Sequence, residues 1–147
     1  MEAADVLKAI SDKRSLEVFK IVALATQDSN FLISKTNLTR KQYYSRVSRL
    51  MNTGLIKRKN GKLTLSTLGK VIYYTTVMQI EIAMNNYWKF KAIDLFEISN
   101  YFLAEELEKV IDKFIDNQEF KTVLVSNIKS KSHQSLLMLH NTRSRAI

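Results

Sequence analysis

Apolar residues recur every three or four positions over most of the chain, which is the spacing of one face of a helix. Residues 3–25 carry this pattern through Leu16, Phe19 and Val22, so we expect a helical scaffold there. Ser11-Asp12 interrupts the stretch with two residue types that favour a helix N-cap. The pattern therefore predicts a scaffold divided into two helical pieces.

Residues 29–37 predict a short helix followed by a tight turn. Ser29-Asn30 can cap a helix over residues 31–36. Asn37 then stands where a left-handed residue is needed, and asparagine adopts that conformation more readily than most residues. The chain should therefore turn directly after residue 36.

A longer helix is expected over residues 40–53. Thr39-Arg40-Lys41-Gln42 has the form of a capping box, in which the first and last side chains bond to each other's backbone N–H groups. Gly54 supplies the C-terminal cap. The apolar stripe of this helix consists of Tyr43, Val47, Leu50 and Met51. The other side carries Lys41, Gln42, Ser45, Ser48 and Arg49, with Tyr44 and Arg46 on the flanks.

Residues 55–66 predict a β-hairpin. Two short runs, Leu55-Ile56-Lys57-Arg58 and Leu63-Thr64-Leu65-Ser66, flank the tetrapeptide Lys59-Asn60-Gly61-Lys62. Asn-Gly is the strongest short hairpin signal, since both residues accept the positive φ of a type I′ turn. The tip of this hairpin should therefore be basic.

The remaining residues predict further helices and a polar end. Residues 67–97 form a long amphipathic segment with apolar side chains on more than one face, so this segment must pack against two surfaces. Another helix is expected from about Leu103-Ala104, and a short one from the capping sequence Asp116-Asn117-Gln118-Glu119 to about Val125. Residues 126–147 are polar and basic, which is typical of a mobile tail.

The composition fits a mainly helical protein, because the 147 residues include only 3 Gly and no Pro. We predict a mainly α fold with a small β-hairpin, in which residues 1–70 form one domain, residues 71–125 a helical region and residues 126–147 a tail. These three parts carry net charges of +9 (14 Lys/Arg against 5 Asp/Glu), −4 (5 against 9) and +4 (4 against none).

The basic residues are concentrated in one part of the first domain. Between Asp28 and Glu81 the sequence holds no acidic residue. The ten basic residues of this window are Lys35, Arg40, Lys41, Arg46, Arg49, Lys57, Arg58, Lys59, Lys62 and Lys70. A basic surface focused in this way favours a polyanionic partner.

Residue content disfavours several classes of chemistry. Without cysteine, the chain has no disulfide, thiolate nucleophile, Fe–S cluster or cysteine-based zinc finger. His133 and His140, the two histidines, lie seven positions apart with no acidic cluster nearby, which disfavours a metal site. Neither a Ser/His/Asp set nor a phosphate-binding glycine loop is present, and Glu105 and Glu106 diverge on a helix. We therefore expect neither an enzyme nor a bound cofactor.

The sequence also contains no recognisable membrane or export segment. The first residues lack the basic and apolar regions of a signal peptide. No apolar run approaches the roughly 18 residues that span a bilayer. We therefore expect a cytoplasmic protein without a membrane partner.

The predicted order of helix, short helix, turn, helix and basic hairpin resembles a known architecture. The run from Leu38 to Leu50, followed by Gly54-Leu55-Ile56 and the basic hairpin, is similar to small archaeal winged helix-turn-helix transcription regulators of the broad ArsR/MarR-like group. The resemblance covers about residues 10–75. It implies that residues 40–53 form a recognition helix in the major groove of DNA, while the hairpin, or wing, contacts phosphates.

The resemblance also implies which residues contact DNA. Those of the recognition helix and its cap are Thr39, Arg40, Lys41, Gln42, Tyr44, Ser45, Arg46 and Arg49. Those of the wing are Lys57, Arg58, Lys59, Asn60 and Lys62. Arginine and glutamine can bond bidentately to guanine and adenine, whereas cations at a hairpin tip neutralise phosphates without reading sequence.

We expect a dimeric transcription regulator that binds double-stranded DNA, with residues 71–125 serving dimerisation or sensing. Residues 71–96 have more apolar circumference than one small domain can cover. The side chains expected in the interface of the homodimer are Ile80, Ile82, Met84, Tyr87 and Trp88. The sequence identifies no small-molecule effector. A protein-interaction module with a winged helix and a nonspecific nucleic-acid-binding protein are the alternatives.

Overall fold

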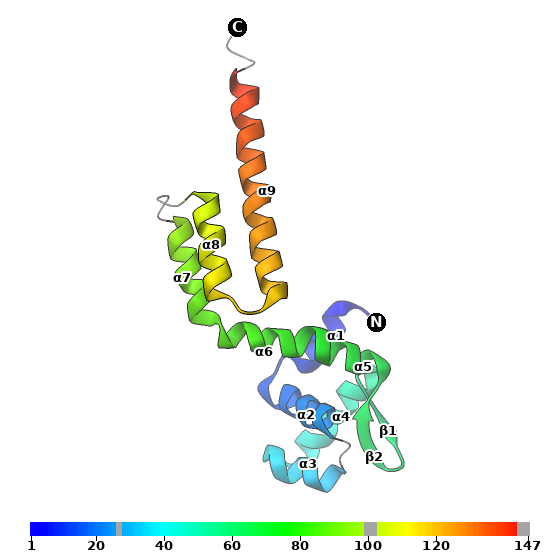
Figure 1. Ribbon diagram of the computed structural model, residues 1–147. Helices are drawn as coiled ribbons and strands as arrows, with labels where there is room; N and C mark the ends of the chain where they lie inside the picture. Colours follow the sequence, from blue (N-terminus) through cyan, green and yellow to red (C-terminus); the bar gives the residue numbers. More distant parts are fainter. Residues whose placement is uncertain (26–27, 99–102, 144–147) are drawn as a thin grey trace. The chain divides into compact units, whose positions relative to one another are not determined.

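The computed structural model describes the backbone of residues 1–25, 28–98 and 103–143, and the side chains as far as residue 131. The chain divides into two compact units, Met1–Glu81 and Ile82–Ile147. The described part is mainly helical and has one two-stranded antiparallel hairpin, which confirms the predicted fold at this level (Figure 1). The first unit extends past the predicted boundary at residue 70, because Tyr73 and Val77 contribute to its core.

The predicted scaffold over residues 3–25 consists of two helices, α1 (Ala3–Ile10) and α2 (Lys13–Leu24). The division falls at Ser11 and Asp12, as the sequence predicts. Asp12 caps α2, because its carboxylate accepts the backbone N–H of Ser15 at 3.0 Å.

Helix α3 (Ser29–Thr36) begins one residue after an acidic cap. The prediction that Ser29-Asn30 caps this helix is wrong, since both residues lie inside it and Asp28 accepts the Phe31 N–H at 2.8 Å. A carboxylate at this end also interacts favourably with the helix dipole. Asn37 follows the helix with φ +49°, which confirms the predicted left-handed turn.

Helix α4 (Arg40–Asn52) starts at the predicted capping box. Thr39 Oγ1 accepts the Gln42 N–H at 3.3 Å, and Gln42 Oε1 accepts the Thr39 N–H at 3.1 Å. Gly54 follows the helix with φ +66°, a conformation that glycine adopts without strain. Both ends of α4 therefore lie within one or two residues of their predicted positions.

The hairpin consists of β1 (Ile56–Lys59) and β2 (Lys62–Leu65), paired so that Ile56 faces Leu65 and Lys59 faces Lys62. Asn60 and Gly61 have φ values of +51° and +76°, as a type I′ turn requires. The Asn-Gly prediction is confirmed.

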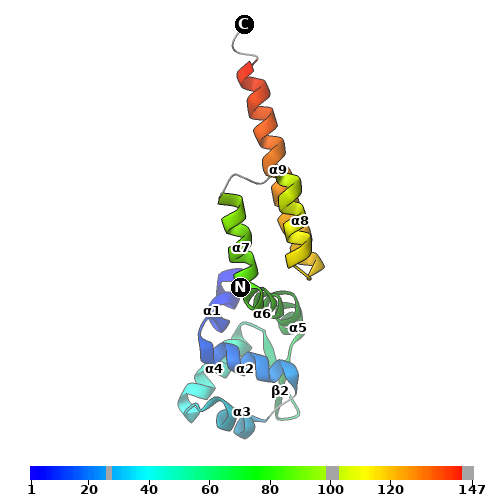
Figure 2. The same cartoon turned by 60° about the vertical axis from the view of Figure 1, so that its left-hand side comes forward.

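Helix α2 lies at the centre of the first unit and packs against α1, α3, α4 and β2 (Figures 1 and 2). Its Val18, Phe19 and Val22 side chains are buried. The predicted apolar stripe of α4 is confirmed for three of its members and wrong for Met51, which is 37% exposed. The fully or almost fully buried apolar residues that α4, the hairpin and neighbouring turns add are Leu38, Tyr43, Val47, Leu50, Leu55, Ile56, Leu63 and Leu65.

The amphipathic segment predicted over residues 67–97 is not one uniform helix. It comprises α5 (Thr67–Ile72), a π-helical turn η1 (Tyr73–Val77), α6 (Met78–Asn85) and α7 (Tyr87–Ile98). The π turn accompanies the burial of Tyr73 and Val77 in the first core. Lys20 of α2 donates a hydrogen bond to Glu81 of α6, and this bond raises the pKa of Lys20.

The second unit contains α7, α8 (Ala104–Phe114) and α9 (Gln118–Arg143). Helix α8 packs against both α7 and α9, and α8 starts where the sequence predicts. The rings of Phe90 and Phe120 meet edge to face with centroids 5.8 Å apart. The buried residues of this core are Ile93, Leu107, Ile111, Ile115 and Ile128.

The predicted end of α9 near Val125 is wrong, because the helix continues to Arg143 (Figure 1). Residues 126–143 of the predicted mobile tail are therefore helical, and residues 144–147 lie outside the described residues. The continuation is understandable, because no glycine or proline follows residue 118 to end the helix. No helix in the described part combines the length and apolar character needed to cross a bilayer.

Gly69 fixes the contact between α5 and the start of the hairpin. A Cβ atom on this residue would lie 1.8 Å from the backbone oxygen of Leu55. We therefore expect Gly69→Ala to lower the free energy of unfolding by about 1–3 kcal/mol, since the backbone must shift to relieve the overlap. Urea unfolding followed by circular dichroism measures the change. Lys70→Ala, at the next and exposed position, is the control, and equal stabilities of the two variants would contradict the prediction.

Candidate nucleic-acid interface

The exposed side of α4 lies opposite its buried stripe. Lys41, Ser45, Ser48 and Asn52 follow one another at helical spacing and are all exposed. The predicted residues Arg40, Gln42, Tyr44 and Arg49 are exposed as well, as is the cap residue Thr39. Ser48 and Asn52 are absent from the predicted set of DNA-contacting residues, although their spacing from Lys41 and Ser45 identifies the shared face. The side chains of this face are mostly short, so a ligand with a groove wide enough for a helix can approach the backbone of α4 closely.

The first turn of α4 carries two positive charges and no negative charge. Arg40 and Lys41 occupy the first two helical positions, where the helix dipole favours an anion. Neither has an ion-pair partner among the described residues. Their placement is locally unfavourable unless an anion binds there.

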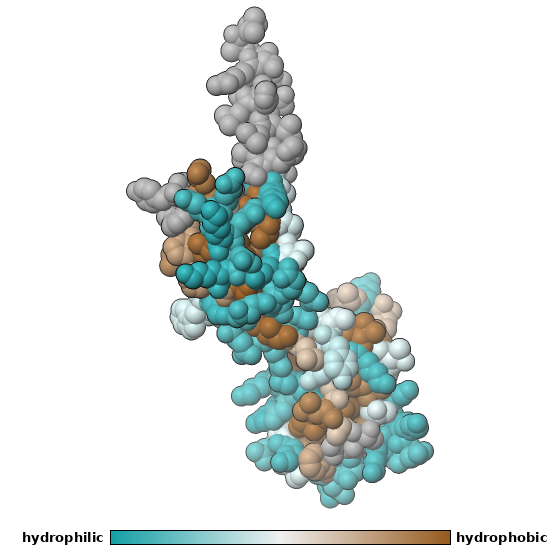
Figure 3. Space-filling model, in the orientation of Figure 1, coloured by the Kyte–Doolittle hydropathy of each residue, from teal (hydrophilic) through white to brown (hydrophobic). Residues whose placement is uncertain are grey.

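The hairpin presents a second group of cations. All five predicted residues are exposed: Lys57, Arg58, Lys59, Asn60 and Lys62. Lys59 and Lys62 stand directly opposite each other across the two strands. Like charges in this arrangement destabilise a β pair. Hydrophilic residues accordingly cover the hairpin end of the first unit in Figure 3.

Tyr43 is a core residue and anchors α4 to α3. Its side chain is fully buried, and its hydroxyl donates a hydrogen bond to Ser29 Oγ at 3.1 Å. Burial raises the pKa of the Tyr43 hydroxyl. The neighbouring Tyr44 ring is exposed and meets Tyr43 edge to face at 5.2 Å between centroids, so only Tyr44 is available to a ligand.

Two of the predicted arginines are engaged within the protein. Arg46 is half-buried, and its Nε lies 3.4 Å from Asp12 Oδ1. Arg49 approaches the other carboxylate oxygen of Asp12 at 3.9 Å. The contact is not evident from the sequence, because Asp12 lies 34 residues before Arg46 and its neighbours indicate only a helix cap.

Gln42 is also engaged, through the capping box. Its Oε1 atom accepts the Thr39 N–H, so in a bidentate contact with adenine this oxygen must either accept a second hydrogen bond or give up the capping bond. Within the described part of the chain, no hydrogen bond engages the amide NH₂ group of Gln42. Gln42 is therefore better placed for a single hydrogen bond than for the bidentate contact that its residue type suggests.

Helix α1 borders the C-terminal half of the exposed face of α4. Asp5 and Lys8 of α1 line the same open hollow of about 600 Å³ as Ser45, Ser48, Arg49 and Asn52. The first turn of α4, with Arg40 and Lys41, does not line this hollow. The part of α4 that lies away from α1 is therefore its first turn, although Ser45, Ser48 and Asn52 are exposed as well.

The predicted interface residues occupy α6 and α7. Trp88 is 80% exposed, and its ring meets that of Tyr87 edge to face at 5.1 Å between centroids. Ile80 and Met84 are also exposed, whereas Ile82 is half-buried. Ile80 belongs to the first unit and the other four residues to the second.

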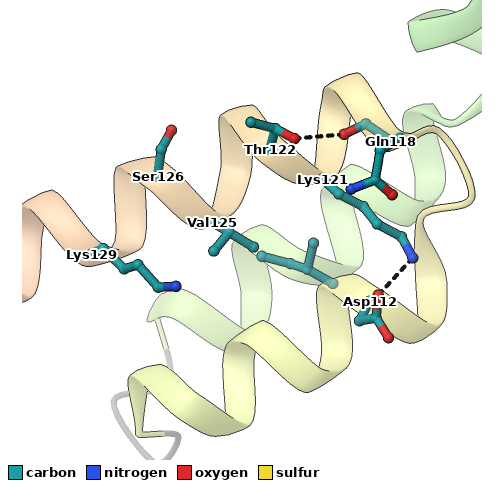
Figure 4. A pocket seen from close by; sticks show the side chains of 8 residues that line it. Asp112, Gln118, Lys121, Thr122, Val125, Ser126 and Lys129 are labelled. Atoms are coloured by element: carbon teal, nitrogen blue, oxygen red, sulfur yellow. Dashed lines mark hydrogen bonds and ion pairs between the residues drawn. The ribbon is translucent and has the colours of Figure 1, made fainter.

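A groove of about 380 Å³ lies between α8 and α9 of the second unit (Figure 4). Ile111 and Val125 form part of its lining. Lys121 forms an ion pair with Asp112 at 2.7 Å, and Lys129 lies 3.7 Å from Glu108. Because both lysines are paired with carboxylates, the groove offers no concentrated charge that would select one class of small molecule.

Comparisons with protein-family models, with curated proteins and with solved structures find no match for this chain. The support for the interface therefore comes from the residues of the chain and their geometry. The three strongest local features are the capped α4, the hairpin and the Asp12 contacts.

Asp12 should make the stability of the protein depend on pH. Burial alone would raise the pKa of this carboxyl group, but the hydrogen bonds from Ser15 and the charge of Arg46 outweigh burial and lower the pKa. A lowered pKa in the folded state adds stability above the unfolded value of about 3.9, and this stability is lost as the pH falls through the folded value. Urea unfolding between pH 2 and pH 7 should show a larger acid loss for the natural protein than for Asp12→Asn. Parallel curves would contradict the assignment.

Proposed function

We propose that this chain is a winged helix-turn-helix protein that binds double-stranded DNA sequence-specifically as a transcription regulator. Helix α4 acts as the recognition helix in the major groove, and the hairpin acts as a wing on the phosphates. The proposal rests on one observation, which is that cations stand at positions where they do not stabilise the folded protein.

This placement occurs twice in the same unit. Arg40 and Lys41 stand at the positive end of α4, and Lys59 faces Lys62 across the hairpin. Natural sequences break local rules mainly at functional sites, where a ligand compensates the cost. Phosphate groups compensate both sets of cations, because each contact releases condensed counterions from DNA.

The two sets have different roles in the proposed complex. Recognition helices contact base edges with their N-terminal residues, and the first turn of α4 does not line the hollow beside α1. The donors that reach the base edges are Lys41, Ser45, the NH₂ group of Gln42 and the two arginines that pair with Asp12 in the free protein, Arg46 and Arg49. Lys57, Lys59 and Lys62 neutralise phosphates and set the register of the protein on the duplex.

We also propose that the DNA-binding form is a homodimer. A single recognition helix with one wing buries too little surface for tight specific binding at physiological salt, and two copies address two half-sites about 34 Å apart. Met84, Tyr87 and Trp88 supply exposed apolar side chains for this contact. The acidic balance of residues 71–125 keeps the dimer region away from phosphates.

The wing can be tested through the salt dependence of binding. Replacing Lys59 and Lys62 together with Ala should weaken binding to all duplexes and lower the magnitude of the slope of log K against log salt by up to about 1.8. Fluorescence anisotropy with a duplex from upstream of the chain's own gene, titrated at several salt concentrations, measures the slope.

The control for the wing variant is Lys89→Ala with Lys91→Ala in α7, which removes the same charge from the second unit. These lysines pair with Asp116 and Asp94. Their loss should leave the slope nearly unchanged. Equal slopes for the two double variants would remove the wing from the interface.

The dimer can be tested by sedimentation velocity at micromolar concentration. The natural protein should sediment with twice the 17.0 kDa mass of one chain. Trp88→Glu should shift it toward monomer, because a charge in an apolar interface is costly to desolvate. Leu24→Glu, at a 77% exposed site of the first unit, is the matched control. A natural protein that remains at 17.0 kDa would refute the dimer and favour a protein-interaction module.

A further inference from the structure

Asp12 connects two elements that are far apart in sequence. Its Oδ1 atom accepts the Ser15 N–H at 3.0 Å, and its Oδ2 atom accepts the Ser15 hydroxyl at 2.5 Å. These bonds fix the carboxylate at the start of α2. The fixed carboxylate then lies 3.4 Å from Arg46 Nε and 3.9 Å from Arg49 Nη1.

The guanidinium group of Arg46 is held from a second side as well. Its Nη1 atom donates to the backbone oxygen of Gln42 at 3.3 Å. The Arg46 side chain is 24% exposed, against 48% for Arg49. Arg46 is therefore the more constrained of the two arginines, and Arg49 keeps part of its freedom.

Asp12 divides the cations of α4 into two classes. In the described part of the chain, the ion pairs of α4 are those of Arg46 and Arg49 with Asp12, while Arg40 and Lys41 have none. Arg40 and Lys41 can therefore bind any phosphate without losing a partner. An arginine held by Asp12 loses a charged partner when it binds DNA.

The cost of losing the Asp12 carboxylate depends on the contact that the arginine makes with DNA. When an arginine leaves Asp12 for a single phosphate, it exchanges one anionic partner for another and gains little binding free energy. A bidentate contact with guanine adds two directional hydrogen bonds and can compensate the loss. The carboxylate therefore weakens indiscriminate phosphate binding more than it weakens binding to a matching base.

We infer that Asp12 is a positioning residue that sets the DNA specificity of α4 by orienting Arg46 and Arg49 and competing with phosphates for them. This inference rests on the proposed DNA-binding function. Asp12 itself does not contact the DNA. Its effect is exerted through the two arginines.

Asp12→Asn tests this role with little effect on the fold, because asparagine caps helices as well as aspartate does. The matched control is Asp28→Asn, which removes the same charge from the cap of α3, where the carboxylate bonds to the Phe31 N–H. No arginine of α4 pairs with Asp28 among the described residues. Thermal melts of both variants establish that they are folded.

The measurement is the affinity for a selected duplex and for random duplexes at several salt concentrations. Asp12→Asn should tighten nonspecific binding and steepen its salt slope by up to about 0.9 for each arginine that it releases to phosphate. The ratio of specific to nonspecific affinity should fall roughly tenfold, which is the discrimination that one oriented arginine provides. Asp28→Asn should leave the ratio nearly unchanged.

A second variant shows whether the effect passes through Arg46. In the Arg46→Gln background, Asp12→Asn should change nonspecific affinity and slope less than in the natural protein, because the released arginine is gone. Equal changes by Asp12→Asn and Asp28→Asn, with DNA binding by the natural protein intact, would overturn the role of Asp12 alone. A natural protein that binds no duplex at low salt would overturn the proposed function itself.

Discussion

The burial of one side of α4 against the first core decides what the rest of this helix can do. Tyr43, Val47 and Leu50 are almost fully enclosed. Each such side chain stabilises the fold by about 1.5–3 kcal/mol relative to its exposed state. Rotation of α4 about its axis would expose all three, so the core holds Lys41, Ser45, Ser48 and Asn52 outward.

The same packing fixes the positions of the hairpin and of the first turn of α4. Leu55, Ile56 and Leu63 place the base of the hairpin in the core that holds α4. The cations of the hairpin and those of the first turn of α4 therefore belong to one rigidly packed unit. The unfavourable charge placements persist because the apolar contacts outweigh them, since each costs a fraction of what one buried side chain contributes.

Local chemistry explains which features could be predicted from the sequence. The Thr39–Gln42 box, the left-handed Asn37 and the Asn60-Gly61 turn each depend on residues within four positions of one another, and all three are confirmed. The predicted cap of α3 is wrong because several consecutive residues, Asp28 among them, are of types that can accept the same N–H. The helix that starts at residue 118 is longer than predicted, because the absence of glycine and proline outweighs the polar composition of this segment.

Contacts between distant residues explain what could not be predicted. Asp12 and Arg46 are 34 positions apart in the sequence, and their contact depends on the packing of α2 against α4. The π turn at Tyr73 likewise depends on how much apolar surface the first core still has to cover. The sequence reports each residue type but not the packing that brings the side chains together.

The two functions of the Asp12 carboxylate can be separated by chemistry. Capping α2 needs only an oxygen acceptor, whereas holding Arg46 and Arg49 needs a negative charge. Asparagine keeps the first and removes the second, so stability and DNA specificity should respond differently to the same substitution. A carboxylate fixed by two bonds from Ser15 also moves little when an arginine leaves it. The arginine that leaves therefore faces a constant internal competitor, and only a well-matched ligand can replace it.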